Sequence, residues 1–173
     1  MTVTTRDMMI ARDKRANLQS KFAVKYSCVL VSYTLNIAGP LKRFERVDCC
    51  FYEGKREIEK AFVCGGHNVF DYVLSDVHTG LECLWALSAD AYELKIALTV
   101  IEEQHPIGRL FDIDVIKSDG EKISRCELNL AERSCLVCGK PGHGCARSRA
   151  HPLDEIIKCT HNIIDSYYTE GDK

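Results

Sequence analysis

The chain has 173 residues, of which 46% are hydrophobic and 28% charged, and its formal net charge is -2. These values are ordinary for one globular domain with its own core, and we expect a single domain over residues 1–173. The slightly acidic charge excludes a whole-molecule attraction to nucleic acid or to an anionic membrane, and the chain has no long apolar run that would predict a transmembrane helix. Residues 1–15 mix charged and apolar side chains and lack the apolar segment of a signal peptide, so we expect a cytoplasmic protein with reduced cysteines.

The first part of the chain predicts a helix, a strand and a second helix. Apolar residues at steps of three and four predict a helix near 5–20, with Arg12 and Arg15 among its charged residues. Residues 28–36 are rich in β-branched and aromatic side chains and predict a central strand. A Gly39-Pro40 turn with basic residues just after it is a plausible anion site, and a helix is expected near 42–60.

The second half predicts the rest of an α/β (α+β) domain with a mixed sheet and flanking helices. Strands are expected near 68–74, 81–87 and 109–116, and helices near 89–104 and 153–168. In the helix near 89–104, Leu94 and Leu98 belong to the buried stripe, while Lys95 and Glu102 are expected on or near the polar side. Residues 122–130 are expected to pair back with the strand at 109–116.

Two aspartates alternate with apolar residues in the strand near 109–116. Asp112 and Asp114 are two positions apart, so they should lie on one face of the strand at a separation of about 7 Å. Paired carboxylates can hold Mg²⁺, which prefers oxygen ligands and often shares them with phosphates. Gly108 allows a close approach to the backbone, and Arg109 could serve a phosphate at the mouth of the strand. The alternative is an exposed polar stripe on an amphipathic strand.

Residues 131–151 form a Cys/His-rich knuckle. Cys135, Cys138, Cys145 and His151 offer three thiolates and an imidazole, a donor set that suits tetrahedral Zn²⁺, with His143 as an alternative fourth ligand. The alternative is a metal-free turn of packed cysteines. In either case, basic side chains interleaved with the cysteines could hold phosphates.

The combination of these motifs resembles a known family, the apo-citrate lyase phosphoribosyl-dephospho-CoA transferases, also called citrate lyase holo-acyl-carrier-protein synthases. The resemblance extends from about residue 8 to residue 157, with Ala38 as a departure where the family tends to have Pro. The segments that carry it are Arg12–Arg15, Val31–Lys42, Leu94-Lys95, Glu102–Pro106, Gly108–Ile116, Arg133–Cys138, Cys145–Arg147 and His151.

This resemblance implies an activity that the composition does not. Members transfer the 2'-(5''-phosphoribosyl)-3'-dephospho-CoA group from its 5''-triphosphoribosyl form to a serine of the citrate lyase acyl carrier protein, and diphosphate leaves. The resemblance then implies that Asp112 and Asp114 hold Mg²⁺, and that one of them or His105 accepts the proton of the serine hydroxyl. Arg109 would act on the leaving diphosphate with Arg12, Arg15 or Arg133.

The remaining expectations concern the knuckle and the fold. Gly108, Arg147 and His151 are expected to contact the donor, while the knuckle itself is expected to be structural. The strand-borne aspartates favour a nucleotidyltransferase-like arrangement by analogy. The alternative function is a zinc-knuckle adaptor for nucleic acid or protein, which the acidic net charge and the lack of Tyr and Phe in residues 131–151 disfavour.

Overall fold

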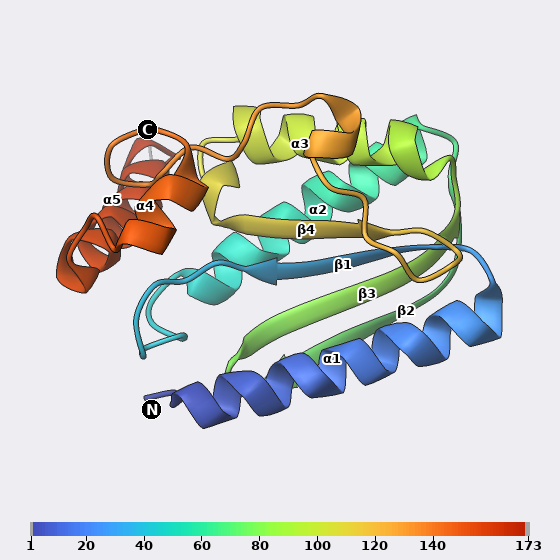
Figure 1. Cartoon of the computed structure of the whole chain (residues 1–173), viewed down its shortest axis with the longest axis horizontal. Helices are drawn as coiled ribbons and strands as arrows, with labels where there is room; N and C mark the ends of the chain where they lie inside the picture. The colour runs from blue at the N-terminus through green and yellow to red at the C-terminus, as the bar shows by residue number, and fades with distance from the viewer. Residues whose placement is uncertain (1, 172–173) are drawn as a thin grey trace.

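The structure is a computed structural model that describes residues 2–171. A four-stranded sheet carries helices on both faces (Figure 1). In chain order the elements are α1 (Thr5–Tyr26), β1 (Val29–Leu35), α2 (Val47–Cys64), β2 (Asn68–Val77), β3 (Gly80–Ser88), α3 (Ala91–Gln104), β4 (Phe111–Ile116), α4 (Gly142–Ser148) and α5 (Leu153–Gly171), with short 3-10 turns η1 (Gly108–Leu110) and η2 (Cys126–Leu128). The predicted α+β class is confirmed.

The strand order in the sheet is β2-β3-β1-β4, and every neighbouring pair is antiparallel. The expectation of a mixed sheet was therefore wrong. Helix α2 connects β1 to β2, and β3 lies between these two strands in the sheet. Helix α3 connects β3 to β4, and β1 lies between them. This interleaved β-α-β-β-α-β order is the split βαβ arrangement, in which strands of the same direction never become neighbours.

The core forms on both faces because the strands alternate their side chains. On one face, α2 and α3 cover the larger apolar cluster, which includes Tyr33, Trp85 and Ile113. On the other face, Phe22 of α1 packs with Leu30, Leu84, Ala86 and Ile116. Helix α1 runs along this second face (Figure 1), and only Ala11 and Phe22 of its residues are buried.

Several element boundaries differ from those predicted, and one predicted strand pairing is wrong. Helix α2 begins at Val47, because Arg46 adopts a left-handed backbone with φ of 70° that a helix cannot include. Strand β4 begins at Phe111, because Gly108–Leu110 form a 3-10 turn between α3 and the strand. Residues 122–130 do not form a strand: after the bridge of Ile116 with Lys122, the chain leaves the sheet and turns at η2.

Helices α4 and α5 lie together at the end of the sheet where β1 ends and β4 begins (Figure 1). Residues 131–150, which join η2 to α5, contain no buried residue. No helix within residues 2–171 combines the length and the apolar character needed to cross a bilayer.

Candidate active site

Two carboxylates of β4 project from the sheet face on which α1 lies. Phe111, Ile113 and Val115 of this strand are buried in the opposite core, so Asp112 and Asp114 alternate with them as the sequence predicts. Asp112 is paired with Thr34 of β1, and Asp114 with Ser32. The strand pattern therefore brings both carboxylates to one surface, next to two hydroxyl side chains.

A third carboxylate lies in the same row across the sheet. Glu82 of β3 is paired with Thr34, which in turn is paired with Asp112. Arg15 of α1 clamps Glu82 with two bonds, from Nη2 to Oε1 at 2.6 Å and from Nε to Oε2 at 3.0 Å. Burial alone would lower the pKa of Arg15, but its hydrogen bond and ion pair with Glu82 and the charges of both aspartates raise that pKa above the usual value. Arg15 therefore stays charged over the carboxylates.

Each aspartate of β4 also has a cationic partner from the segment that follows the strand. Arg133 Nη1 lies 3.3 Å from Asp112 Oδ1, and Thr34 Oγ1 lies 3.5 Å from the other oxygen, Oδ2. Lys122 Nζ lies 2.5 Å from Asp114 Oδ2. Burial, and then the charge of Asp114, raise the pKa of Asp112 from its usual value. The two carboxylates thus repel each other, and a bound cation would relieve that repulsion.

Strand β4 is an edge strand, and buried side chains of α3 replace the missing neighbour. Glu102 Oε1 accepts a bond of 3.1 Å from the Ile113 backbone N–H, and Lys95 Nζ donates one of 2.7 Å to the Ile113 carbonyl. Glu102 Oε2 also binds Arg125 at 2.6 Å. Lys95 and Glu102 are 5% and 3% exposed, so the expectation that they lie on the polar side of α3 was wrong. These bonds fix the strand that carries both aspartates.

Sequence reasoning missed the roles of Glu82, Lys95 and Glu102. Glu82 interrupts the apolar strand β3, and this single polar position was the available signal. Lys95 and Glu102 are seven positions apart, two helical turns, and so share a side of α3. That spacing is the only sign in the sequence that both could turn inward together.

A cleft of about 190 Å³ opens beside Asp112. Its basic lining comes from Arg12 and Arg15 of α1 and from Lys42 after the Gly39-Pro40 turn. Burial, and then the charge of Arg12, lower the pKa of Lys42, whose Nζ donates to the Ile37 carbonyl at 2.5 Å. Three cations lining one cleft suit a polyanionic ligand such as a polyphosphate, although Asp48, Glu82 and Asp112 line the cleft as well.

A second cavity, of about 480 Å³, is lined mainly by the knuckle and by the start of α5. Arg109 and Arg133 line it, and Asn36 borders both this cavity and the first cleft. Arg109 lies on η1 rather than on the strand, and its guanidinium donates to the Ser134 carbonyl. Burial and the charge of Arg133 lower its pKa.

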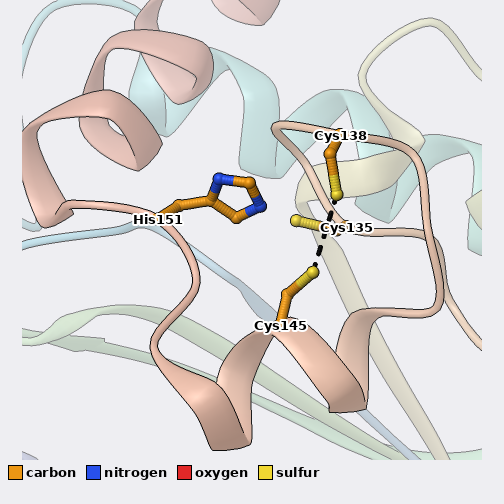
Figure 2. Close-up of side chains that lie close together, drawn as sticks. All are labelled: Cys135, Cys138, Cys145 and His151. Atoms are coloured by element: carbon orange, nitrogen blue, oxygen red, sulfur yellow. Dashed lines mark hydrogen bonds between the residues drawn. The ribbon is translucent and has the colours of Figure 1, made fainter.

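The knuckle residues come together as the spacing predicts (Figure 2). One donor atom from each of Cys135, Cys138, Cys145 and His151 lies within 4.8 Å of the others, so the group could hold a metal ion. Backbone N–H groups of Cys138 and Val137 donate to the sulfur of Cys135 and lower its pKa to about 7. His143, the alternative fourth ligand, is 84% exposed and lies near Glu132 instead.

Three further predicted residues lie away from the aspartates. Gly108 is packed against α3: an added Cβ would lie 2.6 Å from the Ile101 carbonyl oxygen. Arg147 is exposed on α4. His105 contacts the rings of Phe111 and Tyr167, so it lies on the opposite face of the sheet from the carboxylates.

The protein is thus an antiparallel α+β fold of split βαβ topology that presents paired carboxylates on the sheet face along which α1 runs. The family model described as apo-citrate lyase phosphoribosyl-dephospho-CoA transferase matches residues 3–167. The chain therefore belongs to this family, as its motifs indicated.

Individual relatives agree with the family match. The chain is 32% identical over 155 residues to the apo-citrate lyase phosphoribosyl-dephospho-CoA transferase of Citrobacter koseri. The aligned region covers 90% of this chain and 85% of that protein. It is 31% identical over 163 residues to the protein of that name from Escherichia coli O139:H28, covering 94% and 89%. It is also similar to Protein CitXG of Haemophilus influenzae, 31% identical over 160 residues, but spans only 34% of that longer protein against 92% of its own length. The comparisons give no support to the alternative of a zinc-knuckle adaptor.

Proposed function

We propose that this protein transfers the phosphoribosyl-dephospho-CoA group from triphosphoribosyl-dephospho-CoA to a serine of the citrate lyase acyl carrier protein, with release of diphosphate. The observation that carries the proposal is the convergence of Asp112 and Asp114 with the cations of the first cleft. The family match supplies the substrate class, because the relatives are named for this transfer to apo-citrate lyase.

The proposed reaction is a displacement at the α-phosphorus of the donor. The serine Oγ forms a bond to this phosphorus, and the bond from it to the diphosphate oxygen breaks. The serine proton passes to one of the two strand carboxylates, Asp112 or Asp114. Arg12, Arg15 and Lys42 line the cleft in which the triphosphate would lie, and they stabilise the charge that develops on diphosphate.

We propose Mg²⁺ as the cofactor of this site, with Asp112 and Asp114 as its protein ligands. Two carboxylates on one strand fit a cation that keeps several waters and shares phosphate oxygens. When bound, Mg²⁺ supplies charge neutralisation on the triphosphate. The resemblance to nucleotidyltransferases in the use of strand-borne aspartates is an analogy that agrees with this assignment. For the knuckle we propose Zn²⁺, which its three thiols and one imidazole suit.

Diphosphate release in the presence of donor and apo acyl carrier protein tests this assignment. Asp112→Asn and Asp114→Asn should each lower the rate at least about a hundredfold, because each removes a charge on which the transition state depends. Asp119→Asn is the control, since Asp119 lies in the exposed turn after β4. Circular dichroism verifies that each variant is folded. Full rates in both folded strand variants would contradict the proposed chemistry.

A further inference from the structure

The four donors of the knuckle have the arrangement of a closed metal centre. Bonds of about 2.3 Å from zinc to sulfur and about 2.0 Å to nitrogen place tetrahedral donors between about 3 and 4 Å apart. In the structure, all four donor atoms lie within 4.8 Å of one another, and the sulfurs of Cys138 and Cys145 are 3.5 Å apart. A small contraction would bring the set to bonding distance. No disulfide joins these cysteines.

The backbone around Cys135 and Cys138 forms a tight turn that points both sulfurs inward. The Cys135 N–H donates to the Lys140 carbonyl at 2.6 Å, and the Gly139 N–H donates to the Cys135 carbonyl at 3.1 Å. Gly139 has a φ of +70°, a left-handed conformation that glycine adopts without strain. The turn is therefore already folded in the form that a metal requires.

His151 supplies independent evidence for a ligand. Its Nε2 is buried and has no hydrogen-bond partner within residues 2–171, and its ring points toward the three sulfurs in Figure 2. Its Nδ1 lies 3.5 Å from Glu155 Oε2, so an Nδ1–H would face the carboxylate and the lone pair would be on Nε2. Carboxylates orient zinc-bound histidines in this way. A buried nitrogen with no partner is costly, and a metal ion would satisfy it.

The segment that carries the centre has no hydrophobic core of its own. Residues 131–150 contain no buried residue, and α4 has only seven residues. The ligands nevertheless come from separate parts of the chain: the turn, α4, and the connection to α5. One ion bound to all four would cross-link these parts, in the way that metals replace a core in small domains.

The same segment carries Arg133 and holds Arg109 of η1 through a backbone carbonyl. The Arg133 carbonyl accepts from Gly142 N–H at 2.8 Å, and its guanidinium donates to the Phe111 carbonyl and approaches Asp112. Arg109 donates to the carbonyl of Ser134, the residue directly before the first cysteine. Any loosening of the knuckle would therefore free the anchor points of both arginines.

We propose that Cys135, Cys138, Cys145 and His151 bind one Zn²⁺ in a closed Cys₃His centre, and that this centre positions Arg133 at Asp112. The first half stands on the ligand geometry alone. The second half rests on the proposed function, because it assigns Arg133 a place beside the reacting carboxylate. The centre has no open coordination position and takes no part in bond making.

Metal content is the first test. The purified protein, supplied with Zn²⁺ under reducing conditions, should hold one zinc per chain by elemental mass spectrometry. After exchange for Co²⁺ it should show the visible bands of a tetrahedral site and a thiolate-to-cobalt charge-transfer band. Cys145→Ser and His151→Ala should lose tight zinc binding. Cys64→Ser and His143→Ala should retain one zinc, since Cys64 is an exposed residue at the end of α2 and His143 lies outside the cluster.

A wild-type protein that binds no zinc under these conditions, or variants at Cys145 and His151 that bind it as the wild type does, would overturn the centre. Loss of zinc in His143→Ala instead of His151→Ala would overturn the assigned ligand set. The zinc stoichiometry and the cobalt spectrum are measured on the wild-type protein. They therefore decide the proposal even if a variant fails to fold.

Limited trypsin digestion tests the positioning role without the transfer reaction. Arg133, Arg147 and Arg149 provide cleavage sites within the segment, whereas Pro141 blocks cleavage after Lys140. Removal of zinc by a chelator should speed cleavage there by roughly tenfold or more, because the segment then opens without unfolding the sheet. Re-addition of Zn²⁺ should restore protection from trypsin. If the proposed function holds, it should also restore the transfer reaction, with a larger effect on kcat than on KM. Equal cleavage with and without zinc would overturn the positioning role, whatever reaction the protein catalyses.

Discussion

The buried carboxylate of Glu102 joins the aspartate strand to the segment that follows it. Its side chain is 3% exposed, accepts the Ile113 N–H at 3.1 Å, and binds Arg125 at 2.6 Å. Glu102→Gln keeps the shape and one acceptor for Ile113. The new amide group then presents N–H donors to the Arg125 guanidinium, which has only donors itself.

The cost follows from these contacts. A hydrogen bond to a charged group contributes about 1.5–3 kcal/mol, and loss of one partner of a buried ion pair costs about 3–5 kcal/mol. Because Arg125 keeps its bond to Glu103 and Gln keeps the Ile113 bond, we expect the free energy of unfolding to fall by about 2–4 kcal/mol. Urea unfolding followed by circular dichroism measures this difference.

Glu103→Gln is a matched control. Glu103 binds the same arginine, at 2.6 Å through Nη1, but its side chain is 52% exposed. Exposed ion pairs contribute about 0–1 kcal/mol, so this neighbouring variant should be nearly as stable as the wild type. Equal losses in the two variants, or a loss below about 1 kcal/mol for Glu102→Gln, would refute the argument that burial of Glu102 fixes β4.

Three further predictions concern single sites. The pKa of Asp112 is raised, so its ionisation destabilises the folded protein as the pH rises above the ordinary pKa of 3.8. Asp112→Asn should therefore have a higher Tm than the wild type at pH 7, and this gain should vanish near pH 3. A gain in Tm that is constant across this pH range would contradict the raised pKa. Gly108→Ala should lower the free energy of unfolding by about 1–3 kcal/mol because its Cβ would meet backbone oxygens of α3, whereas Gly144→Ala, with open space around it, should not destabilise the protein in urea unfolding. Arg12→Ala should raise KM for the triphosphate donor about tenfold or more through loss of a charged contact, while Arg6→Ala outside the cleft should leave KM unchanged; equal KM values would remove Arg12 from the donor site.

Local periodicity was enough to predict most of the elements. The β-branched run of β1, the alternation around Asp112 and Asp114 and the apolar stripe of α5 each depend on neighbours in sequence. The spacing of the four knuckle residues was also readable, because a tight Cys-x-x-Cys turn is a local structure.

Features that depend on distant partners could not be read from the pattern. A charged residue on an amphipathic helix is expected to face water, yet Lys95 and Glu102 face inward because the edge of β4 needs partners for its backbone. Glu82 joins the carboxylate row only because β3 lies next to β1 in the sheet. The antiparallel pairing, likewise, follows from interleaved connections rather than from any single segment.

The measurement that tests the central claim most directly is the intact mass of the apo citrate lyase acyl carrier protein after incubation with this protein, Mg²⁺ and triphosphoribosyl-dephospho-CoA. The account predicts a mass gain equal to one phosphoribosyl-dephospho-CoA group, lost when the acceptor serine is replaced by alanine. An unchanged mass, with folded protein and a donor that a related transferase can use, would contradict the proposed function.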